Sequence, residues 1–172
     1  MVRALVVVTG PPASGKSALA GPLADHLGFP LVAKDTVKEA LFDALGTGDA
    51  AWSARLSDAA YEVMFALAPT LPEVVLEANF RPEHAPRLLA LVGPKALEVH
   101  CLCPPEEQQR RWSARRRHPG HLDADHPTPP PPAAPGPLGL GPDVLEVDTT
   151  GEVDIVAVAA WARDHLPGVV AI

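Results

Sequence analysis

An eight-residue segment near the start of the chain constrains the fold more than any other feature. The pattern GxxxxGK(S/T) is matched at every fixed position by Gly10-Pro11-Pro12-Ala13-Ser14-Gly15-Lys16-Ser17. The segment directly follows Val2–Thr9, an apolar, β-branched run typical of a strand buried on both faces of a parallel sheet. It leads into a segment in which leucines recur at helical spacing. A strand, a glycine-containing loop and a helix in this order predict a phosphate-binding loop, or P-loop.

The chemistry of this loop predicts a nucleotide and a divalent cation as ligands. Lys16 is expected to reach the β- and γ-phosphates of ATP, and the Ser17 hydroxyl is expected to ligate Mg²⁺. A chance glycine-rich turn is the alternative, but the flanking strand and helix argue against it. The expected nucleotide-binding residues of this segment are Gly10, Pro11, Pro12, Ala13, Ser14, Gly15, Lys16, Ser17 and Ala18.

The rest of the chain alternates between short apolar runs and segments of helical spacing. The expected strands are Val2–Thr9, Leu31–Ala33, Glu73–Ala78, Ala96–Leu102 and Asp143–Asp148. The expected helices are Lys16–Leu27, Thr36–Gly46, Ala51–Ala68, Pro82–Val92, an arginine-rich helix opened by Pro104 and Pro105, and Val153–Leu166. This alternation predicts a three-layer α/β fold, with a parallel sheet and helices on both of its faces.

Size and composition fit one domain that spans residues 1–172. With 47% hydrophobic and 20% charged residues, the chain has the balance of a globular protein. No apolar run is long enough for a membrane helix and the first residues do not resemble a signal peptide, so we expect a cytoplasmic protein without membrane contact. A net charge of −7 argues against general affinity for duplex nucleic acid.

Two unusual segments follow each other in the second half of the chain. Five of the 14 Lys and Arg residues fall between Arg110 and Arg117, which indicates an anionic ligand. Eight of the 21 prolines fall between Pro127 and Pro142, where we expect an exposed, partly extended loop. The expected arrangement is a lid over residues 106–121 and a Pro-rich loop over residues 122–142. The loop is a spacer or, alternatively, a contact for a protein partner.

Two carboxylates follow predicted strands and are therefore expected at the same sheet edge as the P-loop. Glu77 is a candidate for ordering the Mg²⁺ shell or a water, with a solvated strand-end carboxylate as the alternative. Asp35 is placed to accept a hydroxyl proton during phosphoryl transfer, and it is also a candidate helix N-cap; the two roles are compatible. Asn79 and Arg81, just past Glu77, are candidates for orienting an acceptor.

The arginine-rich helix is expected to supply cations to a transferring phosphoryl group. Arg111 and Arg115 are four residues apart and would lie on one helix face. Their guanidinium groups suit the negative charge that spreads over the phosphoryl oxygens in the transition state. A solvated basic face is the alternative. Trp112 is expected to pack under the lid or to stack on adenine.

Two histidines in the lid, His118 and His121, have an open role. Contact with a substrate, a hinge for the lid, and plain loop polarity are three alternatives. A metal site is a fourth, but the spacing matches no known ligand set for the nearby residues Asp123, Asp125 and His126.

Taken in order, these pieces resemble the small P-loop kinases. The pieces are GPPASGKS, Asp35 after the second strand, VVLEANF at the third, RWSARRR in the lid and EVDTT near the end. The set resembles the ATP-dependent phosphotransferase group that contains chloramphenicol phosphotransferase-like and zeta-toxin-like proteins, gluconate and shikimate kinases, and the kinase domain of polynucleotide kinase. The resemblance covers nearly the whole chain except the Pro-rich insert.

The resemblance implies a P-loop NTPase fold with an arginine-rich lid and a five-stranded sheet in the order 2-3-1-4-5. It also implies transfer of the γ-phosphate of ATP to a hydroxyl group. Asp35 matches the acceptor-activating aspartate of these kinases, and Arg111 and Arg115 fall where their lid arginines fall. Thr149 falls in the segment that borders the adenine pocket.

One departure from the resemblance concerns the acceptor. The DxxR pattern typical of polynucleotide kinases reads Asp35-Thr36-Val37-Lys38 here, which sets the chain apart from that subgroup. The expected substrate-binding residues are Asp35, Lys38, Glu77, Asn79, Arg81, His118 and His121.

These inferences favour an ATP-dependent phosphotransferase whose acceptor is a small molecule such as an antibiotic, a sugar or a nucleoside. Two alternatives stay open. One is a nucleotide-dependent regulatory NTPase that uses water as acceptor and binds a protein partner through the Pro-rich loop. The other is a polynucleotide 5′-hydroxyl kinase.

Overall fold

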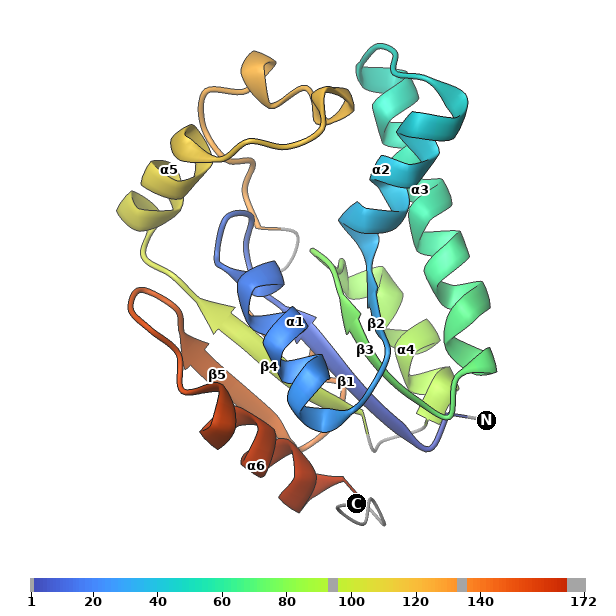
Figure 1. Ribbon diagram of the computed structural model, residues 1–172, viewed down its shortest axis with the longest axis vertical. Helices are drawn as coiled ribbons and strands as arrows, with labels where there is room; N and C mark the ends of the chain where they lie inside the picture. Colours follow the sequence, from blue (N-terminus) through green and yellow to red (C-terminus); the bar gives the residue numbers. More distant parts are fainter. Residues whose placement is uncertain (1, 93–95, 133–135, 167–172) are drawn as a thin grey trace.

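Five parallel strands form one sheet in the order β2-β3-β1-β4-β5 (Figure 1). The computed structural model describes residues 2–92, 96–132 and 136–166. The predicted α/β class, the parallel sheet and its strand order are confirmed. The strands are β1 (Ala4–Thr9), β2 (Leu31–Ala33), β3 (Glu73–Glu77), β4 (Leu97–Leu102) and β5 (Val144–Asp148).

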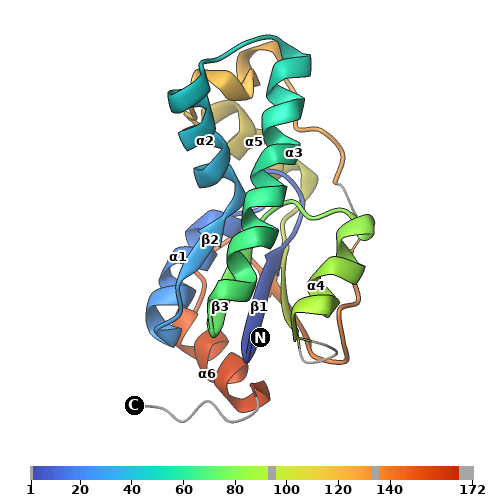
Figure 2. The same cartoon turned by 90° about the vertical axis from the view of Figure 1, so that its right-hand side faces the viewer.

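Helices cover both faces of this sheet, as Figures 1 and 2 show. Helices α1 and α6 pack against one face, and α3 and α4 pack against the other. None of the described helices has the length and apolar character needed to span a membrane. The helices are α1 (Lys16–Leu27), α2 (Lys34–Leu45), α3 (Ala50–Leu67), α4 (Ala85–Val92), α5 (Pro105–Ala114) and α6 (Ile155–His165).

The central strand β1 is buried along its whole length. Its side chains alternate between the layers: Val6 and Val8 pack with α1 and α6, whereas Leu5 and Val7 pack with α3 and α4. Because both faces are covered by helices, no position of the strand favours a polar side chain until Thr9. This explains why β1 reads as an unbroken apolar run rather than as an alternating one.

The register of the sheet brings the ends of four strands to one edge. Val8 of β1 pairs with Glu77 of β3, which in turn pairs with Ala33 of β2. On the other side, Thr9 of β1 pairs with His100 of β4. The segments that follow these strands therefore emerge close together, beside the P-loop that follows β1.

The start of α2 differs from the prediction. The helix begins at Lys34 with Ala33 as its N-cap, so Asp35 lies inside the first turn and caps nothing. The N-cap role is therefore wrong. The physical reason is that both carboxylate oxygens of Asp35 are engaged by cations instead, Lys34 and Arg117.

The end of α5 also differs. The helix stops at Ala114, and Arg115 has extended backbone angles (φ −69°, ψ 151°). The prediction that Arg111 and Arg115 share one helix face is therefore wrong. Arg115 instead pairs with Asp123 and stacks on Trp112, and these tertiary contacts replace a further helical turn.

A buried carboxylate ties the far end of the Pro-rich loop to the sheet. Glu98 of β4 is 0% exposed. Its Oε1 accepts hydrogen bonds from Thr9 Oγ1 (2.9 Å) and the Leu138 amide (2.7 Å), and its Oε2 accepts from the Gly139 amide (3.1 Å). Leu140 then enters the core beneath α3 and α4. At this end, the loop is a fixed part of the domain.

Replacing Glu98 by alanine is expected to destabilise the fold by about 3 kcal/mol or more, because three hydrogen-bond donors lose their buried acceptor. Urea denaturation monitored by circular dichroism measures the loss. The matched control is Glu146→Ala on the neighbouring strand β5, an exposed position where the change should stay within about 0.5 kcal/mol. Equal stability of the two variants would contradict the role given to Glu98.

Candidate functional site

The P-loop has backbone angles that call for glycine at two positions. Gly10 has φ 137° and Gly15 has φ 87°, both in the region that side chains disfavour. A Cβ on Gly10 would lie 2.7 Å from the carbonyl oxygen of Cys101 on β4. The loop therefore runs too close to the sheet to admit a side chain there.

Lys16 is buried inside this loop. Its Nζ donates to the carbonyl oxygens of Gly10 (3.1 Å) and Pro11 (2.7 Å). Burial lowers the pKa of Lys16, and the nearby carboxylate of Glu77 opposes that shift. The Ser14 hydroxyl is also buried, and it has no hydrogen-bond partner among the described residues. A phosphate group would engage both, so the residues present fit a nucleotide phosphate.

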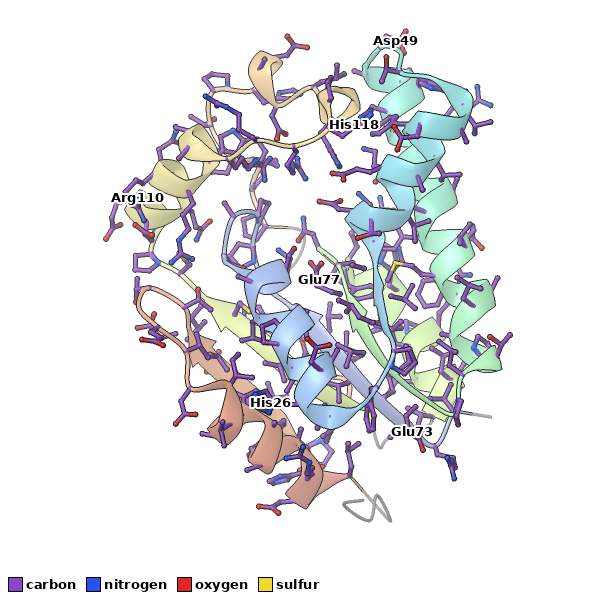
Figure 3. All side chains as sticks on the ribbon, viewed as in Figure 1. His26, Asp49, Glu73, Glu77, Arg110 and His118 are labelled. Carbon is purple, nitrogen blue, oxygen red and sulfur yellow. The ribbon has the colours of Figure 1, made fainter. Side chains whose placement is uncertain are left out.

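Ser17 and Glu77 face each other at the start of α1, where Figure 3 shows Glu77. Ser17 Oγ donates to Glu77 Oε2 at 3.2 Å. Burial raises the pKa of Glu77, and the charge of Lys16 opposes that shift. Hydroxyl and carboxylate oxygens are hard ligands that suit Mg²⁺ in company with phosphate oxygens. In the described part of the chain, no group of three or more His, Cys, Asp or Glu side chains is placed to hold a metal ion.

One cavity of about 630 Å³ joins the P-loop, α2, the lid and the Pro-rich loop. Figure 1 shows the lid reaching from the end of α5 across to the far end of α2. The apolar part of the lining consists of Pro12, Ala13, Ala18, Ala78, Trp112, Pro129, Pro130 and Pro131. The polar part consists of Ser14, Lys16, Ser17, Lys34, Asp35, Lys38, Glu77, Asn79, Arg115, Arg117, His121, Asp123, His126 and Thr128.

Asp35 lies in this cavity between two cations. Its Oδ1 accepts a hydrogen bond from Lys34 Nζ (3.1 Å), and its Oδ2 accepts one from Arg117 Nη1 (2.6 Å). Burial alone would raise the pKa of Asp35, but the charges of Lys34 and Arg117 outweigh it and hold the pKa well below its ordinary value. Asp35 is therefore a carboxylate at neutral pH and can accept a hydrogen bond from a hydroxyl group.

A second carboxylate, Asp123, holds two arginines of the lid. Its Oδ1 accepts from Arg115 Nη2 (2.8 Å) and Arg117 Nη2 (2.6 Å), and its Oδ2 accepts from Arg117 Nε (2.8 Å). The guanidinium of Arg115 stacks on the ring of buried Trp112 at 3.3 Å. The Nε of Arg115 is buried without a hydrogen-bond partner among the residues described. Like the Ser14 hydroxyl, it is a polar atom that a bound anion would satisfy.

Arg111 has a different position. Its Nη2 donates to the Thr149 carbonyl oxygen (2.5 Å) and its Nε donates to Glu107 (2.6 Å), so its side chain is not part of the cavity lining. Thr149 in turn donates from Oγ1 to the carbonyl oxygen of Ser14 in the P-loop (2.5 Å). Arg111 and Thr149 together brace the P-loop against the segment that follows β5.

The lid docks on α2 through an aromatic contact. The ring of Phe42 stacks on His118 at 5.2 Å and meets His121 edge-on at 5.7 Å. Ser53 of α3 donates to the carbonyl oxygen of Gly120 (2.9 Å). Figure 3 shows His118 at this junction of the lid and α2, while Arg110 points away from the molecule.

The cavity gathers most of the residues that the sequence singled out. Arg81 pairs with Asp58 (3.2 Å), and neither it nor His118, which lies 3.3 Å from Asp43, lines the cavity. The other predicted residues outside the lining are Gly10, Pro11, Arg111 and Thr149. The predicted residues that do line it are Pro12, Ala13, Ser14, Gly15, Lys16, Ser17, Ala18, Asp35, Lys38, Glu77, Asn79, Arg115 and His121.

Sequence reasoning missed four features of the cavity. Lys34 and Arg117 flank Asp35, Asp123 fixes the lid arginines, and the residues from Thr128 to Pro131 form part of the wall. Arg117 carried a signal as a member of the arginine run, and Asp123 and the residues from Thr128 to Pro131 lay in segments that the sequence singled out for other roles. Nothing in the spacing of the sequence indicates that Arg117, rather than Arg111, reaches Asp35.

Comparison with known proteins agrees with this architecture. The family model described as "AAA domain" matches residues 5–128. No curated protein matches the chain. Among solved structures, a protein of Chloroflexus aurantiacus J-10-fl described as a "putative kinase" is 32% identical to this chain. The match covers 96% of this chain and 100% of that one, with a TM-score of 0.84.

Two more distant structures share the fold alone. A sugar kinase from Janibacter sp. HTCC2649 is 20% identical, covers 98% of this chain and 99% of its own, and has a TM-score of 0.56. The APS kinase of Mycobacterium tuberculosis, solved with AMPPNP and APS, is 21% identical over 96% and 99% of the two chains, with a TM-score of 0.60.

The lid contact predicts that Gly120→Ala loosens the lid, because the new Cβ would lie 2.6 Å from the buried ring of Phe42. Hydrogen exchange over the lid should become at least about tenfold faster, while exchange in β1 stays unchanged. Gly136→Ala in the Pro-rich loop is the matched control, because its Cβ would meet nothing within 4 Å. Unaltered lid exchange in Gly120→Ala would show that the contact does not hold the lid.

Proposed function

We propose a function from one premise: the chain belongs to the AAA domain family and has the P-loop fold of small kinases. The proposed function is transfer of the γ-phosphate of MgATP to a hydroxyl group of a small molecule. The observation that carries it is that Lys16 of the P-loop and the carboxylate of Asp35 line the same cavity of about 630 Å³. That volume has room for a phosphate chain and an acceptor together.

The nucleotide half of the proposed site is the P-loop with its neighbours. Lys16 would exchange its two carbonyl partners for phosphate oxygens, and Ser14 Oγ would gain a partner. Ser17 and Glu77 would hold Mg²⁺, which supplies charge neutralisation on the phosphates when bound. Arg111 and Thr149 would act on this side by fixing the P-loop backbone.

The acceptor half of the proposed site centres on Asp35. The acceptor oxygen forms a bond to the γ-phosphorus, the bond from that phosphorus to the β–γ bridging oxygen breaks, and its electron pair leaves with ADP. The hydroxyl proton passes to Asp35. Because Lys34 and Arg117 keep the pKa of Asp35 low, this carboxylate orients the hydroxyl first and takes the proton only as the new bond forms.

Arg115 and Arg117 complete the proposal on the lid side. Arg115, whose buried Nε has no partner among the described residues, is positioned by Asp123 to meet the transferring phosphoryl oxygens. Residues 1–172 would act as one kinase domain with a lid at residues 106–121 and a Pro-rich loop at residues 122–142. ATP and a small metabolite as substrates would place the activity in the cytoplasm.

Asp35→Asn is expected to lower transfer by about 100-fold to 10,000-fold, because the proton acceptor is lost, with nucleotide affinity nearly unchanged. Lys16→Ala should instead weaken nucleotide binding. The measurement uses γ-labelled ATP and Mg²⁺ with a panel of sugars, sugar acids, nucleosides, antibiotics and oligonucleotides, and it follows label on each acceptor.

The matched control is Asp25→Asn, an exposed aspartate of α1 outside the cavity lining. Label on one acceptor, lost in Asp35→Asn and kept in Asp25→Asn, supports the kinase. Label that appears only as free phosphate, whatever acceptor is present, contradicts it and favours the regulatory NTPase. Label on oligonucleotides alone favours the polynucleotide kinase.

A further inference from the structure

Lys38 of α2 is the most deeply buried cation on the acceptor side of the cavity. Its side chain lines the cavity together with Asp35, yet it is only 6% exposed. Positions 35 and 38 are three residues apart in one helix, so their side chains leave the same helix face about 5–6 Å apart. A molecule that places its hydroxyl on Asp35 therefore passes within reach of Lys38.

The carboxylates near Lys38 in the described part of the chain already have other partners. Asp35 accepts hydrogen bonds from Lys34 and Arg117, and Asp123 accepts from Arg115 and Arg117. The carboxylate of Glu39, one residue further on, lies 2.9 Å from the ring of His121. Among the residues that the structure describes, Lys38 itself forms no ion pair.

The hydrogen bonds of Lys38 are also incomplete. Its Nζ donates to Ser53 Oγ at 3.0 Å, and the ring of Phe42 lies 5.2 Å away. An ammonium has three N–H donors, so two of them have no protein acceptor within the described residues. Burial and the positive charges of Lys34 and Arg117 lower the pKa of Lys38 to about 8, against the charges of Asp35 and Asp123. The group still carries its proton at neutral pH.

A purely structural role does not account for this charge. Ser53 already uses its own hydroxyl hydrogen to hold the lid at Gly120, and that bond does not need an ammonium beside it. A buried charge without a counter-charge is unfavourable, and an apolar side chain of similar length would fill the space at lower free energy. The charge therefore points to a ligand.

We infer that the acceptor is an anionic alcohol, whose carboxylate or phosphate monoester pairs with Lys38 while its hydroxyl group meets Asp35. This inference rests on the proposed function and names the substrate class for it. Lys34 and Arg117 remain with Asp35, so Lys38 is the residue that recognises the negative charge of the acceptor. The hydroxyl and the acidic group lie within a few bonds of each other, as the one-turn spacing of Asp35 and Lys38 requires.

The first test compares matched alcohols in the labelled-ATP assay: glycerol, glycerate and glycerol 3-phosphate, and glucose, gluconate and glucose 6-phosphate. The inference expects kcat/KM at least tenfold higher for an acid than for its neutral partner. Comparison of the carboxylic acids with the phosphate esters then shows which of the two acidic groups Lys38 binds. Efficient transfer to neutral alcohols without preference for acids would overturn the inference and leave the kinase proposal intact.

Variants assign the preference to Lys38. Lys38→Met should lower the acid-to-neutral ratio by at least tenfold, and Lys38→Arg should restore part of it. Ser53→Ala removes the neighbouring hydrogen bond to the lid but keeps the charge, so it should keep the preference. Loss of the preference in Ser53→Ala, with retention in Lys38→Met, would mean that the lid contact sets it instead. Thermal unfolding checks that each variant folds.

The second test needs no acceptor turnover. The chain has only four lysines, so ¹⁵N-lysine labelling resolves each side-chain ammonium by NMR. In this experiment Mg²⁺ and AMPPNP saturate the nucleotide half of the site, and sulfate is then added. Sulfate should raise the pKa of Lys38 by about one unit, because this shift corresponds to tenfold tighter binding of the anion to the protonated lysine. The shift should appear in Ser53→Ala as well. A pKa of Lys38 that does not respond to sulfate, glycerate or glycerol 3-phosphate would overturn the inference.

The pH dependence has a defined sign. The groups that face Lys38 are Lys34 and Asp35 on its own helix, Ser53 on α3, Arg117 and His121 on the lid, and Asp123 at the start of the Pro-rich loop. As the pH rises past about 8, free Lys38 loses its proton, so KM for an acidic acceptor should rise while KM for ATP does not. A KM for the acid that stays flat from pH 7 to pH 9.5 would contradict the pairing.

Discussion

The parallel register of β1 with its two neighbours is the constraint on which the rest of the site depends. Because Val8 pairs with Glu77 and Thr9 with His100, the P-loop leaves the sheet at the level where β3 presents a carboxylate and β4 presents its last carbonyl groups. Cys101 then closes the space behind Gly10 so tightly that no side chain fits. A slip of one residue would turn the side chains of β1 to the opposite layer and take Glu77 away from Ser17.

Those parts of the molecule that depend on neighbours in sequence could be predicted from the sequence. The P-loop is one continuous segment, and the apolar run of β1 reports its burial directly. The strand order was predicted from the resemblance of the ordered motifs to known kinases, and the structure confirms it.

The lid could not be predicted in the same way. Which arginine meets Asp35 is decided by contacts across 82 residues, and α5 ends early because Arg115 gains Trp112 and Asp123 as partners. Helical spacing predicted that Arg111 and Arg115 lie on one face of a helix, and that prediction is wrong because the helix ends at Ala114.

The two sides of the cavity are built by different physical means. The proposed nucleotide side is mainly backbone: loop carbonyls, glycine angles and the start of a helix shape the P-loop. The proposed acceptor side is mainly side-chain charge, in which Lys34, Arg115 and Arg117 share two carboxylates among them. In such a network each charge is held by its neighbours, and among the described residues of this side Lys38 is left without an ion pair. The sequence alone does not reveal this, because the partners come from α2, the lid and the start of the Pro-rich loop.

The wall formed by Pro129, Pro130 and Pro131 has a consequence for conformational entropy. Each proline ring fixes its own φ angle and restricts the residue before it, so this stretch has few conformations to lose when the cavity fills. Glu98 anchors the same loop further along, at Leu138 and Gly139. The proline wall of the cavity is therefore preorganised, and a ligand that packs against it costs the protein little conformational entropy on binding.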